Sequence, residues 1–365
     1  MSIQAMKVRG AVAFAADRAL EIVALDLRAP REGEVMVRML AAGLCHSDLS
    51  MLEGKIASYG FPILLGHEGA GVVVAYGPGV TSVKPGDYVV PTPIPECRAC
   101  TNCLSGRTNL CERMFSRPES PFSFEGQPVA AFSSLGTFAD HSVIEEIRLA
   151  RVTPAVPPEI ACYIGCGVLT GVGSALTAAD LWPGCSVAIF GLGGIGLCVL
   201  QGARIAGAAR IIGVDINPAR EATARDYGAT DFINPRETPD VPAAIRALTG
   251  AGVDCAFECV GHTALMAEAF ACTTPAGGQA VSVGIAPSGS ELRFDPASFM
   301  TGRSWKGALL GGEKPRSAIP RLADWYERGF LRLDDLISHR LTLDEVNQGF
   351  ALMKSGDTVR SVILY

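Results

Sequence analysis

The feature that most constrains the fold is a glycine-rich turn at residues 191–196, which joins an apolar strand to a helical segment. Gly191, Gly193 and Gly196 fit the pattern G-x-G-x-x-G. The pattern alone is weak, but a strand is expected before it at Val187–Phe190 and a helix after it at Ile195–Ile205. This strand–turn–helix order is the setting in which such a turn binds the pyrophosphate of a dinucleotide.

Each glycine has its own reason in such a turn. Gly191 would make the tight bend, Gly193 would let the backbone approach the pyrophosphate, and Gly196 would let helix and sheet pack closely. The N-terminus of the helix that follows the turn would offer free N–H groups and the positive end of its dipole to the phosphates.

Asp215 stands at the end of the next strand, 19 residues after Gly196. A carboxylate there accepts hydrogen bonds from the ribose hydroxyls of NAD and repels the extra phosphate of NADP. The sequence therefore predicts NAD. The alternative is a glycine turn in a nucleotide-free fold, with Asp215 only capping the following loop.

Strands and helices alternate through this part of the chain. One helix is expected to begin with Asn217 as its N-cap and to end before Gly228. Alternation of this kind implies an α/β protein with a parallel, doubly wound Rossmann sheet. Six strands are expected, at Val187–Phe190, Arg210–Val214, Asp231–Ile233, Val253–Phe257, Gln279–Val283 and Trp305–Leu310.

The flanking segments have a different character. The first 90 residues indicate short strands and Gly/Pro turns, and the C-terminal part indicates two helices and a closing strand at Ser361–Tyr365. A chain of 365 residues is long enough for two domains. We predict a nucleotide domain at residues 168–310, inserted into a mainly-β domain formed by residues 1–167 and 311–365.

Four cysteines in the segment 95–113 form a strong metal-binding pattern. Cys97, Cys100, Cys103 and Cys111 follow the spacing C-x2-C-x2-C-x7-C. Four thiolates complete a closed tetrahedral shell around zinc, with no position left for a substrate, so this site is expected to be structural. The alternative, two disulfides or free thiols, is less favoured for a cytoplasmic chain.

Three separated pieces suggest a second, open metal site. They contain Cys45, His67 and Cys166, and each piece alone is a weak signal. Two thiolates and one imidazole would leave the fourth zinc position for water or an alcohol oxygen, whose pKa the ion lowers.

These pieces, the cysteine lobe and the glycine turn occur in the order seen in zinc-dependent medium-chain alcohol dehydrogenases. The chain resembles that family nearly end to end, including Ile164–Gly167 with Thr170-Gly171, and Gly302–Gly307. It is most similar to the animal-type and glutathione-dependent classes and their bacterial aryl and primary alcohol dehydrogenase relatives. The resemblance implies a GroES-like catalytic domain beside the Rossmann domain.

The resemblance also implies residue roles. Cys45, His67 and Cys166 would bind the catalytic zinc, Ser47 would hydrogen-bond the alcohol, Asp48 would orient the histidine, and Glu68 would lie behind the metal. Positions near the cofactor are matched by His46 and Arg360 (pyrophosphate), Arg220 (adenosine ribose), and Thr170, Ile195, Val260 and Ile285 (nicotinamide). The positions that shape the substrate pocket are Pro93, Ser116, Leu135, Ile285, Leu309 and Leu310, whose mostly apolar nature suggests an uncharged, bulky or aromatic alcohol.

Two positions depart from the family pattern. Ser50 stands where the family often has the histidine that ends the proton relay, so proton exit through water and a changed pH profile are hypothesised. Phe115 stands where glutathione-dependent members have an arginine, which argues against S-(hydroxymethyl)glutathione as the substrate.

Composition limits the remaining possibilities. A net charge of −6 argues against a nucleic-acid partner, and the N-terminus lacks the basic and apolar stretches of a signal peptide. We expect a cytoplasmic protein without a membrane segment, and a homodimer, with a tetramer as the alternative.

The predicted function is hydride transfer between a primary or aryl alcohol and NAD, with two zinc ions per chain. Three alternatives stay open: a nicotinoprotein that keeps NAD bound and uses another electron acceptor, a reductase of activated C=C bonds, and a catalytically silent nucleotide-binding protein.

Overall fold

A computed structural model describes residues 5–56, 59–356 and 358–365. The chain divides into two compact units. One is formed by residues 1–166 together with 314–365, and the other by residues 167–313. Each unit is described by itself.

The unit of residues 167–313 is built on a six-stranded sheet with the order β13-β12-β11-β14-β15-β16. All neighbouring strands are parallel, so the expected doubly wound sheet is confirmed. Its central strands β11 and β14 are mostly apolar and buried, as expected for strands covered on both faces. The strands are β11 Ser186–Phe190, β12 Arg210–Val214, β13 Asp231–Ile233, β14 Cys255–Glu258, β15 Gln279–Ser282 and β16 Ser304–Gly307.

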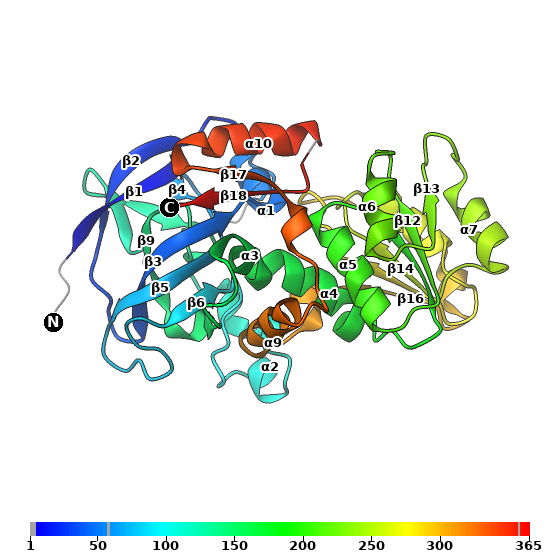
Figure 1. Cartoon of the computed structure of the whole chain (residues 1–365), viewed down its shortest axis with the longest axis horizontal. Coiled ribbons are helices and arrows are strands. Elements are labelled where there is room, and N and C mark those ends of the chain that lie inside the picture. The colour runs from blue at the N-terminus through cyan, green and yellow to red at the C-terminus, as the bar shows by residue number, and fades with distance from the viewer. Residues whose placement is uncertain (1–4, 57–58, 357) are drawn as a thin grey trace. The chain divides into compact units, whose positions relative to one another are not determined.

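Helices connect these strands, and Figure 1 shows α5 and α6 beside the sheet. Helix α7 illustrates the local signals: the Asp240 side chain accepts a hydrogen bond from the Ala243 N–H at 2.9 Å, and Gly250 follows its last residue. The helical elements of this unit are α4 Leu169–Gly173, η6 Ser174–Ala178, α5 Gly194–Ile205, α6 Arg220–Tyr227, α7 Val241–Thr249, α8 Thr263–Ala271, η7 Pro296–Phe299 and η8 Leu309–Gly312.

Two sequence-based boundaries in this unit were wrong. Asn217 is not the N-cap of α6: its side chain accepts from the Ala219 N–H in a short turn, and the helix begins at Arg220. The last strand ends at Gly307 rather than at Leu310, because Leu310 has a φ of 47° and the chain turns into η8. The sequence therefore predicted that helix α6 and strand β16 exist, but not where α6 begins or where β16 ends.

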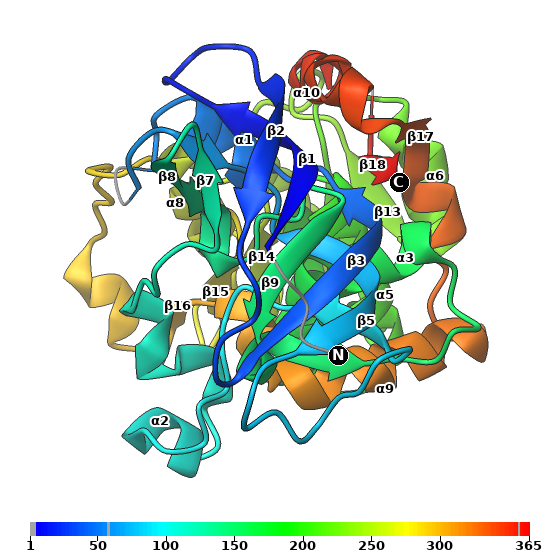
Figure 2. The same ribbon diagram turned by 90° about the vertical axis from the view of Figure 1, so that its left-hand side faces the viewer.

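The other unit contains a closed barrel and a seven-stranded sheet (Figure 2). The barrel has the order β1-β2-β7-β8-β4, and the sheet has the order β10-β6-β5-β3-β18-β17, with β9 also paired to β3. The strands are β1 Met6–Ala13, β2 Glu21–Leu27, β3 Glu34–Gly43, β4 Ile63–Leu64, β5 Glu68–Tyr76, β6 Tyr88–Pro91, β7 Phe122–Phe124, β8 Gln127–Ala131, β9 His141–Glu145, β10 Leu149–Arg151, β17 Ile337–Leu341 and β18 Arg360–Leu364.

Strand β18 joins the two ends of the chain in one sheet. It pairs antiparallel with β3, with Val362 opposite Gly43. The helical elements of this unit are α1 His46–Leu52, α2 Thr101–Leu104, η1 Thr108–Leu110, η2 Glu112–Phe115, η3 Phe132–Ser134, η4 Glu146–Arg148, α3 Pro158–Tyr163, α9 Pro315–Glu327, η9 Asp334–Leu336, η10 Leu343–Glu345 and α10 Val346–Ser355.

A continuous helical run covers Pro158–Ala178, and it changes pitch on the way. Residues Ile164–Val168 form a π-helical turn, η5, between α3 and α4. By length and composition this run is apolar enough to cross a membrane, but 83% of its apolar window is buried in the protein, as in a core helix.

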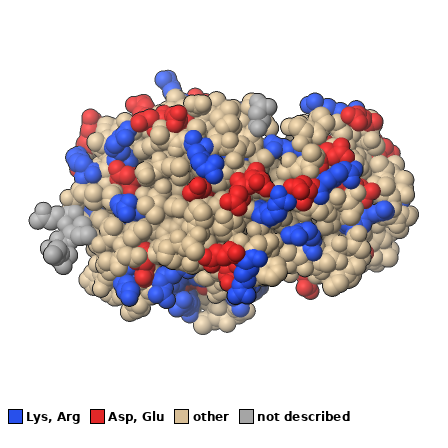
Figure 3. Space-filling view, viewed as in Figure 1, with Lys and Arg blue, Asp and Glu red and all other residues tan. Residues whose placement is uncertain are grey.

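The charged side chains are mixed over the face shown in Figure 3. Lys and Arg alternate there with Asp and Glu on both units. This distribution matches the net charge of −6 and differs from the basic face of a nucleic-acid-binding protein.

Candidate metal centres and dinucleotide site

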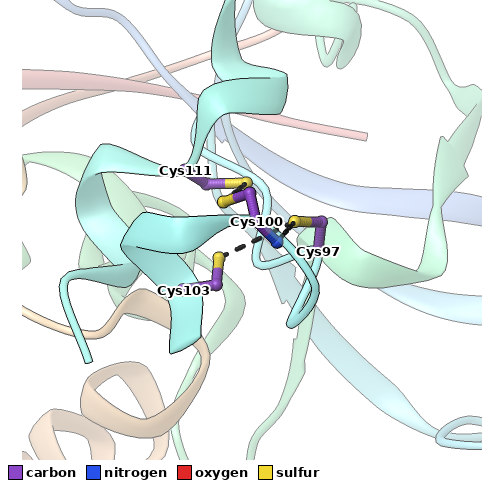
Figure 4. A group of neighbouring side chains, drawn as sticks. All are labelled: Cys97, Cys100, Cys103 and Cys111. Atoms are coloured by element: carbon purple, nitrogen blue, oxygen red, sulfur yellow. Dashed lines mark hydrogen bonds between the residues drawn. The ribbon is translucent and has the colours of Figure 1, made fainter. Parts of the chain in front are cut away.

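The four lobe cysteines converge on one point (Figure 4). Their sulfur atoms lie within 4.8 Å of one another. Cys97 Sγ is 3.8 Å from Cys103 Sγ, and Cys100 Sγ is 4.0 Å from Cys111 Sγ. A zinc–sulfur distance of about 2.3 Å gives a tetrahedron with edges of about 3.8 Å, so this arrangement fits a closed zinc shell.

Backbone N–H groups favour the thiolate form in this lobe. Desolvation raises the pKa of Cys97, but N–H groups of Ala99 and Cys100 lower it, with a net value of about 6. The Cys100 N–H lies 3.3 Å from Cys97 Sγ. A thiolate held in this way is prepared for a cation before one binds.

A second cluster brings together Cys45, His67, Glu68 and Cys166, whose ligand atoms also lie within 4.8 Å of one another. Strands β3 and β5 pair with Gly43 opposite Glu68, which places Cys45 beside His67. Cys166 comes from the π-helical turn η5, and its sulfur is 3.4 Å from His67 Nε2. Cys45 and Cys166 are 22 and 99 positions away from His67 in the sequence, and the three side chains nevertheless meet at one buried point.

Asp48 lies behind the histidine of this cluster. Its Oδ2 is 3.1 Å from His67 Nδ1, and its Oδ1 accepts a hydrogen bond from the Gly66 N–H at 2.9 Å. With Nδ1 facing a carboxylate, the imidazole presents Nε2 to the two sulfurs, which is the orientation that a metal ligand needs.

Within the part of the chain that the structure describes, only one of the two carboxylate oxygens of Glu68 is paired. Oε2 pairs with Arg360 Nη1 at 2.7 Å, while the buried Oε1 has no hydrogen-bond partner among the described residues. Desolvation raises the pKa of Glu68 to about 7. A buried polar atom without a partner is rare, and a cation held by Cys45, His67 and Cys166 would supply one.

The two thiols of the cluster share a hydrogen bond. The Cys166 thiol donates to Cys45, which lowers the pKa of Cys45 well below its usual value and raises that of Cys166. The positive charge of His67 lowers the pKa of Cys45 further. The donor set of two sulfurs and one imidazole nitrogen fits zinc.

Three predicted residues lie on helix α1 next to this cluster. The Ser47 hydroxyl is 3.8 Å from Cys45 Sγ and is half-buried, whereas His46 is exposed. Ser50 is half-buried one turn further along the helix.

Arg360 is 6% exposed, and it contacts Glu68, the Leu44 carbonyl and the ring of Tyr163. These contacts hold its guanidinium against the buried side of the metal cluster.

The glycine turn has the shape that a dinucleotide requires. Gly191 has a φ of +88°, and a Cβ on Gly196 would lie 1.8 Å from the Gly191 carbonyl oxygen. Nothing lies within 4 Å of a Cβ position on Gly193, which leaves its outer side open. Gly194 begins α5, and its neighbour Ile195 is half-buried.

Asp215 is attached to this turn. Its Oδ2 accepts the Leu192 N–H at 2.7 Å and its Oδ1 accepts the Asn217 N–H at 2.8 Å. Each carboxylate oxygen keeps a further lone pair. The carboxylate therefore fixes the glycine turn and can still accept a ribose hydroxyl.

Exposed apolar side chains follow the carboxyl ends of three neighbouring strands, where ligands of open α/β sheets bind. Val260, Ile285 and Leu309 come after β14, β15 and β16 and are 56%, 66% and 40% exposed. Thr170 is buried on α4, and Arg220 is half-buried at the start of α6.

The predicted pocket positions divide into buried and accessible ones. Pro93 is half-buried and Ser116 is exposed, whereas Leu135 and Leu310 are buried. Leu135 packs in an apolar cluster with Val37 and Ile144. Leu135 therefore has no exposed surface here, and its place in the substrate pocket stays a prediction.

The sequence reasoning missed two side chains beside the site. The ring of Phe132 meets the ring of His67 edge-on at 5.3 Å, and the buried Arg148 donates from Nη1 to the Pro93 carbonyl at 2.5 Å. No motif marks either residue. Arg148 stands close to Glu145 and Glu146 in the sequence, so its charge does not single it out there.

Comparison with known proteins agrees with this geometry. Residues 31–155 match the alcohol dehydrogenase GroES-like domain, and residues 194–328 match the zinc-binding dehydrogenase domain. The chain is 44% identical over 375 aligned positions to an S-(hydroxymethyl)glutathione dehydrogenase of Paracoccus denitrificans, covering 99% of this chain and 100% of the relative. It is 43% identical over 376 positions to a class-3 alcohol dehydrogenase of Cereibacter sphaeroides, with the same coverage.

Solved structures show the same fold. Benzyl alcohol dehydrogenase from Acinetobacter calcoaceticus superposes with a TM-score of 0.91 at 33% identity, covering 98% of this chain and 99% of that one. An alcohol dehydrogenase zinc-binding domain protein from Burkholderia ambifaria gives a TM-score of 0.93 at 34% identity, covering 99% of both chains. The chain belongs to the zinc-dependent medium-chain alcohol dehydrogenase family and is an oxidoreductase that acts on CH–OH groups.

Proposed function

We propose that this enzyme transfers a hydride between a primary alcohol and NAD, with one catalytic and one structural zinc ion per chain. The observation that carries the proposal is the convergence of Cys45, His67 and Cys166 at a buried point, with the unpaired Glu68 oxygen beside them. Three protein ligands of this type are typical of catalytic zinc, and the four sulfurs of the lobe are typical of structural zinc.

The residues around the cluster have separate tasks in this proposal. When bound, zinc supplies a Lewis acid that makes the alcohol proton easier to remove. Ser47, whose hydroxyl is 3.8 Å from Cys45 Sγ, would accept that proton and pass it toward solvent. Asp48 keeps His67 in the tautomer that presents Nε2.

NAD is the proposed cofactor because Asp215 stands at the glycine turn. Its carboxylate would accept the ribose hydroxyls and repel the additional phosphate of NADP. The phosphates would meet the N-terminus of α5 beside Gly193, and Val260, Ile285 and Leu309 would offer an apolar surface to the nicotinamide.

Two substrate classes have support. An aryl alcohol is favoured by the apolar residues at the matched pocket positions and by the likeness to a benzyl alcohol dehydrogenase. S-(hydroxymethyl)glutathione is favoured by the names of the relatives, whereas Phe115, in place of the arginine of glutathione-dependent members, argues against it.

One assay decides among these possibilities. Purified protein is analysed for zinc and then given NAD with benzyl alcohol, or with formaldehyde and glutathione, while NADH is followed by absorbance. NADH formed in many turnovers supports the dehydrogenase. If turnover occurs only with an artificial acceptor and NAD stays bound through dialysis, the protein is a nicotinoprotein, and zinc-loaded protein without any turnover would refute the enzyme assignment.

We further infer a cytoplasmic homodimer. Strand β16 is the edge of its sheet, and a second copy could pair with it. Sedimentation of the purified protein tests the dimer against the tetramer.

A further inference from the structure

Arg148 is among the largest fully buried side chains of the protein, with 2% of its surface exposed. Arginine is seldom buried unless its charge is paired. Here Nε lies 3.1 Å from Glu145 Oε2, and Nη1 donates to the Pro93 carbonyl at 2.5 Å. The buried cation is therefore held between one carboxylate and one backbone carbonyl.

The carbonyl that Arg148 binds belongs to Pro93, which lies just beyond the end of a strand. Strand β6 ends at Pro91, and Pro93 has no N–H to donate to a neighbouring strand. The Thr92 N–H bonds to the Arg148 carbonyl at 2.9 Å, and the Glu96 N–H bonds to the Ile147 carbonyl at 3.0 Å. The Arg148 side chain thus supplies a donor to the Pro93 carbonyl, between the two backbone bonds made by Thr92 and Glu96.

The same stretch of backbone packs against the turn that carries a metal ligand. A Cβ on Gly165 would lie 2.3 Å from the Pro91 carbonyl oxygen and 3.0 Å from Val90 Cγ1. Gly165 precedes Cys166 in the π-helical turn. A change in the position of Pro91–Pro93 would therefore be transmitted directly to Cys166.

Glu145 connects this network to the cysteine lobe. Besides Arg148, it pairs with Arg113, which lies in η2, two residues after Cys111. One carboxylate therefore joins the segment after the four-cysteine cluster to the arginine that holds the end of β6.

We infer that Arg148 is a positioning residue: its guanidinium fixes the backbone of Pro91–Pro93 and thereby sets both the Pro93 wall of the substrate pocket and the placement of Cys166. The pocket part of this inference rests on the proposed function. The placement of Cys166 does not, because it follows from the bond between Arg148 and the Pro93 carbonyl and from the close approach of Gly165 to Pro91.

The test uses Arg148→Met, which removes the charge and both hydrogen bonds, and Arg148→Lys, which keeps the charge but loses the planar fork. Each protein is loaded with Co²⁺ in place of zinc, and its visible spectrum reports the thiolate ligands. The ratio of kcat/KM for benzyl alcohol to that for a bulkier alcohol such as cinnamyl alcohol is then measured with the zinc enzyme. We expect shifted cobalt–thiolate bands and a change of about fivefold or more in this ratio for Arg148→Met, with smaller changes of the same direction for Arg148→Lys.

Arg303→Met is the matched control. Arg303 also donates to a backbone carbonyl, that of Phe270, and to Thr273 Oγ1, but it belongs to the unit of residues 167–313. We expect this variant to lose thermal stability while its cobalt spectrum and substrate ratio stay as in the wild type.

The outcomes separate the inference from the proposed function. If folded Arg148→Met or Arg148→Lys protein keeps the wild-type cobalt spectrum and substrate ratio, Arg148 has only a structural role and the inference is wrong. Should Arg148→Met fail to fold, Arg148→Lys decides. If the wild type oxidises no alcohol, the proposed function fails, and the cobalt spectrum still tests the placement of Cys166.

Discussion

Asp48 Oδ2 lies 3.1 Å from His67 Nδ1, and both side chains are buried. The carboxylate also accepts the Gly66 N–H, so its position is fixed by the backbone that leads into His67. The imidazole is thereby held in one orientation before any metal binds.

Replacing Asp48 by Asn should weaken zinc binding at the Cys45–His67–Cys166 cluster. The amide cannot stabilise positive charge on the imidazole, and loss of such a carboxylate typically costs about 10–100-fold in metal affinity. Zinc affinity measured by competition with a chelator checks this. Asp140→Asn is the control, because Asp140 also pairs with a histidine, His141, at a distance of 2.9 Å, and neither residue belongs to either of the two metal clusters. Equal effects of the two changes on zinc affinity would contradict the role of Asp48.

Removing one lobe cysteine should remove one metal ion and destabilise its unit. Cys103→Ala leaves three sulfurs around the point where four meet, so we expect one zinc ion per chain instead of two and a lower melting temperature. Elemental analysis and a thermal melt measure both. Cys255→Ala, a change in the buried strand β14, should retain both ions even though it also lowers stability.

Asp215→Asn should reduce the preference for NAD over NADP. The amide can still accept the Leu192 N–H, but it no longer repels a phosphate, and loss of a charged hydrogen-bond partner corresponds to about a tenfold change or more. The ratio of kcat/KM values for the two cofactors is the measurement. Asp254→Asn serves as control, since Asp254 also accepts a backbone N–H, from Ser186 at 2.7 Å, but at the opposite end of the sheet. An unchanged ratio in Asp215→Asn would remove the basis for predicting NAD.

The pair Arg28–Glu34 should make stability depend on pH in the acid range. Desolvation raises the pKa of Glu34, but hydrogen bonds from Arg28 and from the Arg31 N–H lower it by more, and the net pKa is below the usual value. A carboxyl with a lowered folded-state pKa stabilises the fold above its unfolded pKa, and this contribution is lost as the pH falls through the folded value. Glu34→Gln should therefore lower stability at pH 7 by about 1 kcal/mol and make it less sensitive to acid.

Urea denaturation of the wild type and Glu34→Gln at pH 7 and at pH 4 measures this difference. The two free energies of unfolding should approach each other at the lower pH. A gap that widens with acid would reverse the sign and show that Glu34 does not act through this pair.

Ser50→His should add an ionisation to the reaction. Serine cannot titrate near neutral pH, whereas histidine, placed at this half-buried position of α1, has a reference pKa of about 6.5. We expect a new inflection between about pH 6 and 7 in the pH dependence of kcat/KM. An unaltered profile and rate would mean that proton exit does not pass position 50.

The sequence predicted the nucleotide unit well because its signals are local. The strand Arg210–Val214 and the helix from Gly194 to Ile205 follow from apolar periodicity and glycine turns, and both lie where they were expected within one residue. The ends of some elements were harder to predict from the sequence. The strand that begins at Ser304 stops at Gly307, and the chain then turns at Leu310, which has a left-handed backbone conformation.

The catalytic cluster required the family resemblance because its ligands meet only through long-range pairing. The residues around Cys45 and His67 do not predict that β3 pairs with β5, or that Gly43 lies opposite Glu68 in this pairing. Arg148 was missed for the same reason, since its partner Pro93 lies 55 residues away.

The π-helical turn Ile164–Val168 determines the direction in which one thiolate points. An α-helix advances about 100° per residue, so deleting a single position between Pro158 and Cys166 would rotate that sulfur by roughly a quarter of a turn away from His67. The number of residues in this helix is therefore as strict a requirement for the metal centre as the identity of the ligands. A deletion in the helix that left all of the ligands in the sequence would still abolish the metal centre.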